Sequence, residues 1–255
     1  MKVAVCVKHA IDETELKIDS SGSPQLRGAA SKMSTFDKNA VEEALRLKSA
    51  HTGEVAIFTV GTPEAKKTMK EALAMGADRG VLITADPMSM QTSRTAELLA
   101  AALMNGGPYD LILCSEGSSD VYSGLVPPML GEKLGLPYVG YVRKIEATGQ
   151  TARLERALED SIEVIEARFP LVASVVSEIN EPRYPTLIQI MQAGKKPLQE
   201  VTPEALLPGS SPSPSLVMGM KAQAMARKKV VFEGAPDETA KKLLDALASE
   251  GVLPR

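Results

Sequence analysis

The fold of this chain is decided by the stretch EVAIFTVGTPEAKKTMKEALAMGADRGVLIT, residues 54–84. It opens with an almost continuous apolar run over 54–60, which is typical of a strand buried on both faces of a sheet. A threonine, a proline and a glutamate follow in the order that opens a helix, so we predict a helix over Thr62–Met75 that ends at Gly76. A second apolar run covers 80–84. Strand, helix and strand in this order form the repeating unit of a parallel sheet.

The same alternation continues toward both ends of the chain. Short apolar runs predict three further strands, and apolar residues at helical spacing predict three further helices. The last of these helices contains Pro127 and Pro128, which fit only in its first turn. Because such units bury a sheet between two layers of helices, we predict a doubly wound, mostly parallel α/β sheet with right-handed crossovers. The strands are expected at 2–8, 109–115 and 171–178, and the helices at Asp37–Lys48, Thr92–Asn105 and Ser123–Leu134, with Glu42, Glu43 and Arg46 facing water.

The pattern changes in the second half of the chain. Charged and apolar residues partly alternate over 143–168, which predicts antiparallel strands at the edge of the sheet. Beyond Pro182 the periodicity is lost, so we expect the α/β domain to cover 1–192.

The remaining residues, 193–255, are expected to form an extended arm. The Pro- and Ser-rich run at 208–215 has the composition of a flexible linker. A final helix is predicted at Asp237–Ser249, with an apolar stripe that must pack on something. A long segment without its own core usually serves a function, and reaching a partner subunit is one such function. The stripe consists of Ala240, Leu243, Leu244 and Leu247.

Composition excludes several classes of protein. The 255 residues carry 29 basic and 32 acidic side chains, and without a strongly basic stretch there is no electrostatic footprint for a nucleic-acid partner. The first apolar run is too short for a signal peptide or a membrane span, so we expect a cytoplasmic protein without membrane insertion. Cys6 and Cys114 lie in predicted buried strands and are expected to be reduced core thiols, while His9 and His51 complete no metal site.

Candidate binding residues follow from the expected topology. In a doubly wound sheet, ligands bind at the carboxyl ends of the strands, where helix N-termini attract anions. Three segments lie at such places, Val7–Asp12, Gly61–Ala65 and Ser115–Gly124. The third carries small hydroxyl residues and two glycines, which let the backbone approach an anion closely. The same residue types also form ordinary caps and turns, so this loop alone leaves both interpretations open.

Several catalytic motifs are missing from the sequence. It contains neither a P-loop, nor a dinucleotide fingerprint after the first strand, nor a nucleophile elbow. His9 follows the first strand and either touches a ligand or makes structural hydrogen bonds. Phe36 either forms a hydrophobic staple at the start of its helix or lies against a flat cofactor.

One segment of the sequence is far more specific to one protein family than the loops and motifs above. NEPRYPTL at 180–187, followed by Ile190-Met191 and Lys195-Lys196-Pro197, closely resembles the recognition segment of electron-transferring flavoprotein beta subunits. Further matches are AVEEALRLK at 40–48, ALAMGADR at 72–79, and Arg156–Asp160 leading to Phe169-Pro170, so the resemblance spans nearly the whole chain.

The resemblance implies a noncatalytic electron carrier with an α/β fold of the adenine-nucleotide-binding type. Such a subunit forms a heterodimer with an alpha subunit that holds most of the FAD. The pair takes electrons from flavin dehydrogenases, such as the acyl-CoA dehydrogenases of fatty acid oxidation, and passes them to a quinone reductase. The beta subunit itself holds AMP or, in electron-bifurcating members, a second FAD.

The resemblance also assigns residues. The segment 183–194 becomes the docking loop for dehydrogenases, with Leu187 as its anchor, although Leu187 covering the sheet edge is the alternative. The other partner residues are Arg183, Tyr184, Ile190 and Met191. The nucleotide site falls on Cys6, Ser34, Phe36, Asp37, Gly61, Ala65, Ser115, Ser118, Ser119, Asp120, Ser123 and Gly124.

Departures from the family pattern leave the nucleotide open. Ser34-Thr35 stands where members commonly have Asn-Pro, and the loop over 115–124 is shorter than usual. The run Gly-Arg-Gln-Ala-Ile-Asp-Gly-Asp, which is common in bifurcating members, is missing, and this favours AMP over a second FAD. An ATP pyrophosphatase would need glycines after the first strand, and a nucleotide-sensing stress protein would have no reason to carry the segment 181–197, so both rivals are less favoured.

Overall fold

The computed structural model describes all residues except 27, 210–218, 220, 223–227 and 254–255. The chain divides into two units, Met1–Met220 and Lys221–Arg255, and each is described by itself.

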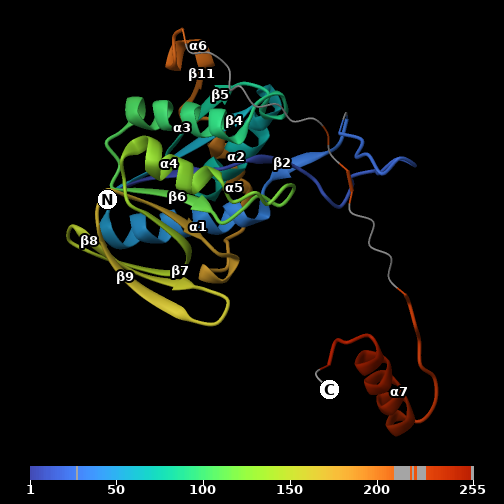
Figure 1. The fold of residues 1–255 in the computed structure, drawn as a ribbon. Coiled ribbons are helices and arrows are strands. Elements are labelled where there is room, and N and C mark those ends of the chain that lie inside the picture. Colours follow the sequence, from blue (N-terminus) through green and yellow to red (C-terminus); the bar gives the residue numbers. More distant parts are fainter. Residues whose placement is uncertain (27, 210–218, 220, 223–227, 254–255) are drawn as a thin grey trace. The chain divides into compact units, whose positions relative to one another are not determined.

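The first unit is built on a nine-stranded sheet in the order β11-β5-β4-β1-β6-β10-β7-β8-β9 (Figure 1). All pairs from β11 to β7 are parallel, and the last two pairs are antiparallel. The five predicted strands and the antiparallel excursion at the edge are therefore confirmed. The strands are β1 (Lys2–Cys6), β4 (Glu54–Gly61), β5 (Arg79–Thr84), β6 (Leu111–Ser115), β7 (Tyr138–Thr148), β8 (Thr151–Ala157), β9 (Ile162–Arg168), β10 (Leu171–Val175) and β11 (Leu198–Val201).

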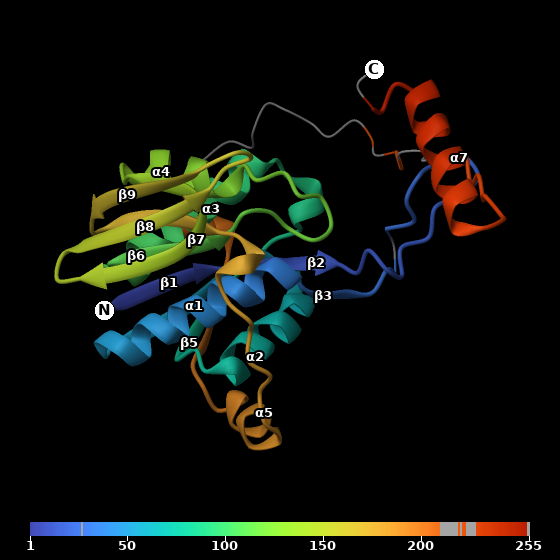
Figure 2. The ribbon, with the colours of Figure 1, turned by 90° about the horizontal axis from the view of Figure 1, so that it is seen from below.

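Helices cover both faces of this sheet, as a doubly wound fold requires (Figures 1 and 2). On one face, α1 (Thr35–His51) and α2 (Lys66–Met75) pack on Val3, Val5 and their neighbours. On the other, α3 (Thr92–Gly106) and α4 (Val126–Leu134) pack on Ala4, Cys6 and theirs. Alternate residues of β1 thus enter two separate cores, which explains why its sequence is apolar from Val3 to Cys6.

Several element boundaries differ from the predictions. The predicted helix at 62–75 begins as a 3₁₀ turn, η1 (Pro63–Ala65), before α2. Helix α4 begins at Val126, so both prolines do fall in its first turn. The first strand ends at Cys6. The residues after it form β2 (His9–Ile11), which pairs with β3 (Ser31–Met33) in a small antiparallel sheet. This sheet was not predicted, because strands of three residues are too short to show a pattern in the sequence. Two further 3₁₀ turns are η2 (Pro87–Ser89) and η3 (Ser177–Ile179).

The expected domain end at residue 192 is wrong. Strand β11 pairs with β5 as an outer strand of the sheet, and α6 (Pro203–Leu206) follows it. The segment 183–194 is also not wholly irregular, because it contains α5 (Leu187–Ala193), opened by a capping box between Thr186 and Gln189. Four-residue and seven-residue elements are too short to show a period in sequence.

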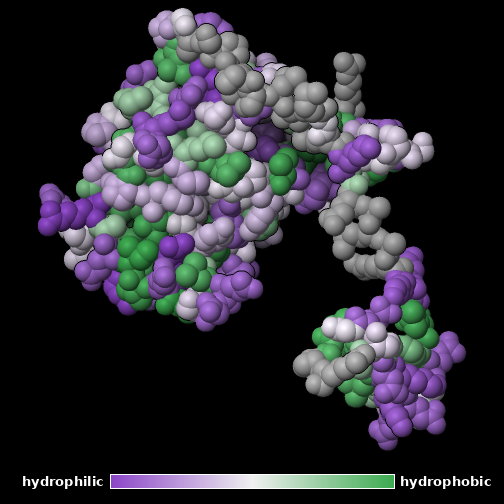
Figure 3. Space-filling model, viewed as in Figure 1, coloured by the Kyte–Doolittle hydropathy of each residue, from purple (hydrophilic) through white to green (hydrophobic). Residues whose placement is uncertain are grey.

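The second unit contains α7 (Pro236–Ser249), close to the predicted helix. Every residue of α7 is exposed or half-buried, including Leu243 and Leu244 of the predicted stripe. Figure 3 shows apolar side chains gathered on one side of this unit and hydrophilic ones on the other. Most of the linker expected at 208–215 lies outside the described residues.

Candidate functional site

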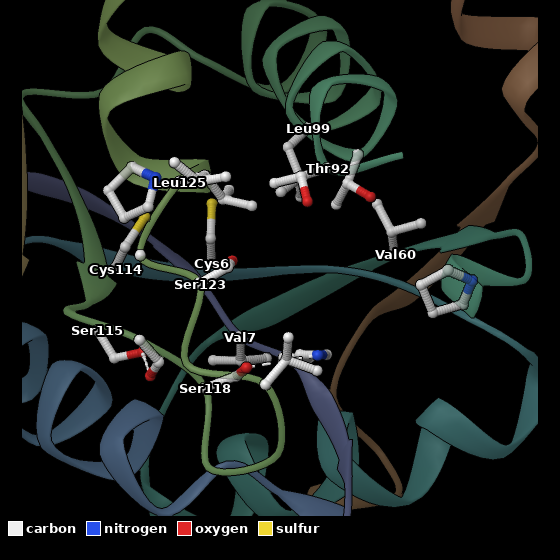
Figure 4. Close-up of a pocket in the computed structure, with 18 of the residues that line it drawn as sticks. Cys6, Val7, Val60, Thr92, Leu99, Cys114, Ser115, Ser118, Ser123 and Leu125 are labelled. Atoms are coloured by element: carbon white, nitrogen blue, oxygen red, sulfur yellow. Dashed lines mark hydrogen bonds between the residues drawn. The ribbon is translucent and has the colours of Figure 1, made fainter. Parts of the chain in front are cut away.

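A cavity of about 240 Å³ opens at the carboxyl ends of β1, β4 and β6 (Figure 4). One wall is apolar and comes from the end of β4, from η2 and from the start of α3 and α4. The opposite wall is polar and comes from the segments that follow β1 and β6. The apolar wall includes Val60, Met88, Met90, Leu99, Leu125 and Val126, and the polar one Lys8, Asp37, Ser115, Ser118 and Ser123.

Lys8 supplies the positive charge of this cavity. Its ammonium lies 2.7 Å from Asp120 Oδ1 and 3.4 Å from Ser118 Oγ, and the other oxygen of Asp120 accepts the backbone N–H of Ile11 at 3.3 Å. Burial raises the pKa of Asp120, but the hydrogen bonds from Lys8 and Ser118 outweigh it and leave the pKa below its ordinary value. Lys8 was not among the predicted site residues, although its place directly after the first strand was a signal for it.

Asp37 is a buried carboxyl at the start of α1. Its Oδ2 accepts the backbone N–H of Lys8 at 2.6 Å, and its Oδ1 lies 2.5 Å from Ser115 Oγ. Burial raises the pKa of Asp37 to about 7, against the effect of these hydrogen bonds. The single hydroxyl proton of Ser115 has a second acceptor, Gly117 O at 2.8 Å, so a proton on Asp37 completes a chain from Asp37 through Ser115 to Gly117.

A second cavity of about 440 Å³ lies beside the first and shares Lys8, Pro87 and Met88 with it. His9 lines this cavity and its Nδ1 lies 2.8 Å from Thr68 Oγ1, so the structural hydrogen bond expected as one alternative is present. Burial lowers the pKa of His9, which favours the neutral ring. Its Nε2 is buried and without a partner among the residues that the structure describes.

The predicted nucleotide residues divide between the two cavities. Cys6, Asp37, Ser115, Ser118, Ser123 and Gly124 line the first, and Gly61 and Asp120 line the second. The other four, Ser34, Phe36, Ala65 and Ser119, are absent from both linings, which are drawn from the described residues only.

Two of these four residues position the loop after β6. The backbone N–H of Ser119 donates to Ser34 Oγ at 3.2 Å, which ties the loop to the start of α1. Ala65 is buried under Gly61, where a Cβ on the glycine would lie only 2.6 Å from Ala65 Cβ. The hydrogen bond between Ser119 and Ser34 is structural, because it holds two backbone segments together. Ala65 is structural as well, because its side chain fills the space beside Gly61.

Phe36 lies outside the cavity and contacts an aromatic neighbour. Its ring meets that of Tyr122 edge to face, with 5.5 Å between the ring centres. Since Phe36 is inside α1 rather than before its N-cap, Ser34, the hydrophobic staple considered for it is wrong. Tyr122 is exposed and has a positive φ of 49°, which is unusual for an aromatic residue.

Cys6 and Cys114 are buried free thiols at the ends of the neighbouring strands β1 and β6. Both line the first cavity (Figure 4). A hydrogen bond with Cys6 and burial raise the pKa of the Cys114 thiol. Within the described residues, no group of three or more His, Cys, Asp or Glu side chains is placed to hold a metal ion.

The predicted partner residues form an apolar surface on α5 and the turn before it. Tyr184 is 93% exposed, Leu187 80% and Met191 78%, and Ile190 is exposed as well. At this exposure Leu187 does not cover the sheet edge, so that alternative is wrong. Arg183 instead turns back to α1, where Glu42 accepts its side chain.

Two acidic residues of α1 are placed differently from the prediction. Glu42 and Glu43 were expected to face water, but they are 4% and 7% exposed. Their carboxylates accept hydrogen bonds from Arg183 and Asn180, which lie about 140 residues further along the chain. None of the helices in the described part of the chain is long and apolar enough to cross a membrane.

Comparison with known proteins identifies the family to which this chain belongs. A family model described as electron transfer flavoprotein domain matches residues 26–206. Electron transfer flavoprotein subunit beta of Thermoanaerobacterium thermosaccharolyticum is 33% identical over 99% of this chain and 100% of its own length. The protein of the same name from Bacillus subtilis is 34% identical over 98% of both chains, and that from Clostridium acetobutylicum is 36% identical over 77% of this chain and 76% of its own. The chain therefore belongs to the electron transfer flavoprotein beta subunit family.

Proposed function

We propose that this chain pairs with an alpha subunit to carry electrons and that it holds an adenine nucleotide itself. The observation that carries the proposal is the cavity of about 240 Å³, which gathers six of the predicted site residues at the carboxyl edge of the sheet. An apolar wall opposite a wall of serines and a lysine suits a flat base at one end and a phosphate at the other.

Adenine would lie against the apolar wall near Val60 and Leu99, and the phosphate near Lys8, Ser118 and Ser123. Lys8 would be the main group that attracts the phosphate. The N-terminus of α4 would contribute little, because Pro127 and Pro128 leave it few free N–H groups. The N–H groups of Ser119, Val121 and Tyr122 already have partners within the protein.

AMP is the nucleotide that we propose. A second FAD in an electron-bifurcating protein is the alternative, and one observation favours it. The adjoining cavity of about 440 Å³, which shares Lys8 with the first, offers room for a longer ligand.

The chain has a noncatalytic role in this proposal. FAD held mainly by the alpha subunit supplies the redox chemistry when it is bound. Phe36 and Tyr122 would lie beside that flavin, since they pair at the surface outside the nucleotide cavity. The apolar stripe of α7, with Leu243 and Leu244 exposed, suits contact with the alpha subunit.

Electrons would come from flavin dehydrogenases that dock on the segment 183–194 and would pass to a quinone reductase. Acyl-CoA dehydrogenases are the donors that we propose, which would place the protein in fatty acid oxidation in the cytoplasm. The exposed side chains of Tyr184, Leu187 and Met191 support this docking site, because apolar anchors at this exposure are rarely left without a partner.

The test is to co-express the chain with its alpha subunit, denature the purified heterodimer and identify the released nucleotides. One FAD and one AMP per heterodimer are expected, two FAD would support the bifurcating alternative, and FAD alone would refute the nucleotide site.

Two matched variants locate the phosphate. Lys8→Met should release AMP, whereas Lys67→Met, a lysine of the second cavity alone, should retain it. The opposite result would place the phosphate in the second cavity.

A further inference from the structure

We infer that Glu42 is a positioning residue that, through Arg183, holds the docking segment 183–194 in a single place on the surface. The inference rests on the docking role proposed above, and it concerns how the exposed side chains of that segment are kept in position.

Glu42 binds Arg183 through three contacts. Its Oε2 accepts the backbone N–H of Arg183 at 3.2 Å and the Nε–H at 2.7 Å, and its Oε1 accepts Nη2–H at 3.0 Å. Burial raises the pKa of Glu42, but the hydrogen bonds from Arg183 bring it below its ordinary value, so the carboxylate is charged. Because the carboxylate of Glu42 binds both the guanidinium and the backbone N–H of Arg183, the side chain of Arg183 is held in one orientation.

Two neighbours of Glu42 on α1 hold the residues just before Arg183. Asn39 Nδ2 donates to Ser177 O at 2.9 Å and to Asn180 O at 2.8 Å. Asn180 Nδ2 donates in return to Asn39 O and to Glu43 Oε2, both at 3.0 Å. Positions 39, 42 and 43 lie on one face of the helix, so α1 presents a continuous polar face to this part of the chain.

The far end of the segment is held separately. Lys196 donates to Leu73 O at 2.8 Å and Ala77 O at 2.7 Å, at the C-terminal end of α2. Ala193 is buried, and α5 packs beside α2 (Figure 2). The residues from Tyr184 to Met191 thus form a bridge between two fixed ends.

Two physical arguments favour positioning over simple stabilisation. The Glu42 side chain is 5% exposed but the Arg183 side chain is 43% exposed, and an ion pair that water reaches contributes little to the stability of a fold. The rest of α1 is already held by apolar residues such as Val41, Ala44 and Leu45. A bridge fixed before docking, in contrast, loses less conformational entropy when a partner binds.

The first experiment measures hydrogen exchange on the heterodimer with bound cofactors, for Glu42→Gln and Arg183→Lys. Glu146→Gln, which removes an exposed ion pair on the antiparallel edge, is the control. We expect exchange within 184–193 to become about tenfold faster in both variants, with an unchanged melting temperature and an unchanged control. Unchanged exchange there, or faster exchange throughout α1 with a lower melting temperature, would overturn the inference.

The second experiment separates this inference from the docking proposal. Electron transfer from a purified acyl-CoA dehydrogenase is measured at varied concentrations of the heterodimer. Glu42→Gln and Leu187→Ala should both raise KM several-fold at constant kcat. If Leu187→Ala leaves KM unchanged, the docking proposal fails while the exchange result still decides the role of Glu42. If Leu187→Ala raises KM and Glu42→Gln does not, positioning by Glu42 is refuted.

Discussion

Replacing Asp37 by Asn should remove most of the pH dependence of this chain's stability near neutrality. Burial raises the pKa of Asp37 from 3.8 to about 7 in the folded protein. A carboxyl whose pKa is raised on folding stabilises the folded state below its unfolded pKa, and this contribution is lost as the pH rises through the folded pKa. Asn has nearly the same shape as the protonated acid, and its amide can donate to Ser115 Oγ while its oxygen accepts the Lys8 N–H.

The size of the effect follows from these two pKa values. Between about pH 5.5 and about pH 8 the free energy of unfolding should fall by about 2 kcal/mol because of Asp37 alone. The full loss well above the folded pKa is roughly 4 kcal/mol. The Asn variant lacks this titration, so it should be the more stable protein at the alkaline end.

The assay is urea unfolding of both proteins across this pH range, after removal of nucleotide, because a bound ligand adds its own stabilisation. Groups other than Asp37 titrate equally in both proteins, so the difference between the two curves isolates this carboxyl. Parallel curves would refute the reasoning and would mean that Asp37 is charged in its buried position at neutral pH.

Five further outcomes are expected. Leu187→Ala should weaken binding of an acyl-CoA dehydrogenase by roughly 1–3 kcal/mol, or about five- to hundredfold, in a titration of the heterodimer, with the melting temperature unchanged. Ser123→Asp should place negative charge against phosphate, so both the nucleotide content and the thermal stability should fall, and retention of both would put the site elsewhere. The chain alone should not retain FAD through gel filtration, and Phe36→Ala should alter the flavin spectrum of the heterodimer. Removal of residues 221–255 should leave the first unit folded but weaken assembly with the alpha subunit, and full-strength assembly would contradict a role for α7.

The strands and helices of the core depend on local sequence, and these elements were predictable. The strands β1, β4, β5, β6 and β10 were predictable because a strand buried on both faces is apolar at most of its positions, whichever strands lie beside it. The helices α1, α2, α3 and α4 were predictable for a similar reason, since one face of each packs on the sheet. The first cavity also lies where this topology predicts a ligand site, at the carboxyl ends of the strands.

Tertiary structure alone decided the features that depend on distant partners. Strand β11 joins the sheet beside β5, more than a hundred residues away in sequence, through backbone hydrogen bonds that leave no pattern in its own four residues. Glu42 and Glu43 look like the solvent-facing acids of an ordinary helix, yet Arg183 and Asn180 approach them and bury them. The sequence of a helix does not show whether water or a distant side chain donates hydrogen bonds to its carboxylates. Only the folded chain brings distant residues together, and it thereby buries Asp37, which raises its pKa, and ties the segment 183–194 to α1 through Arg183.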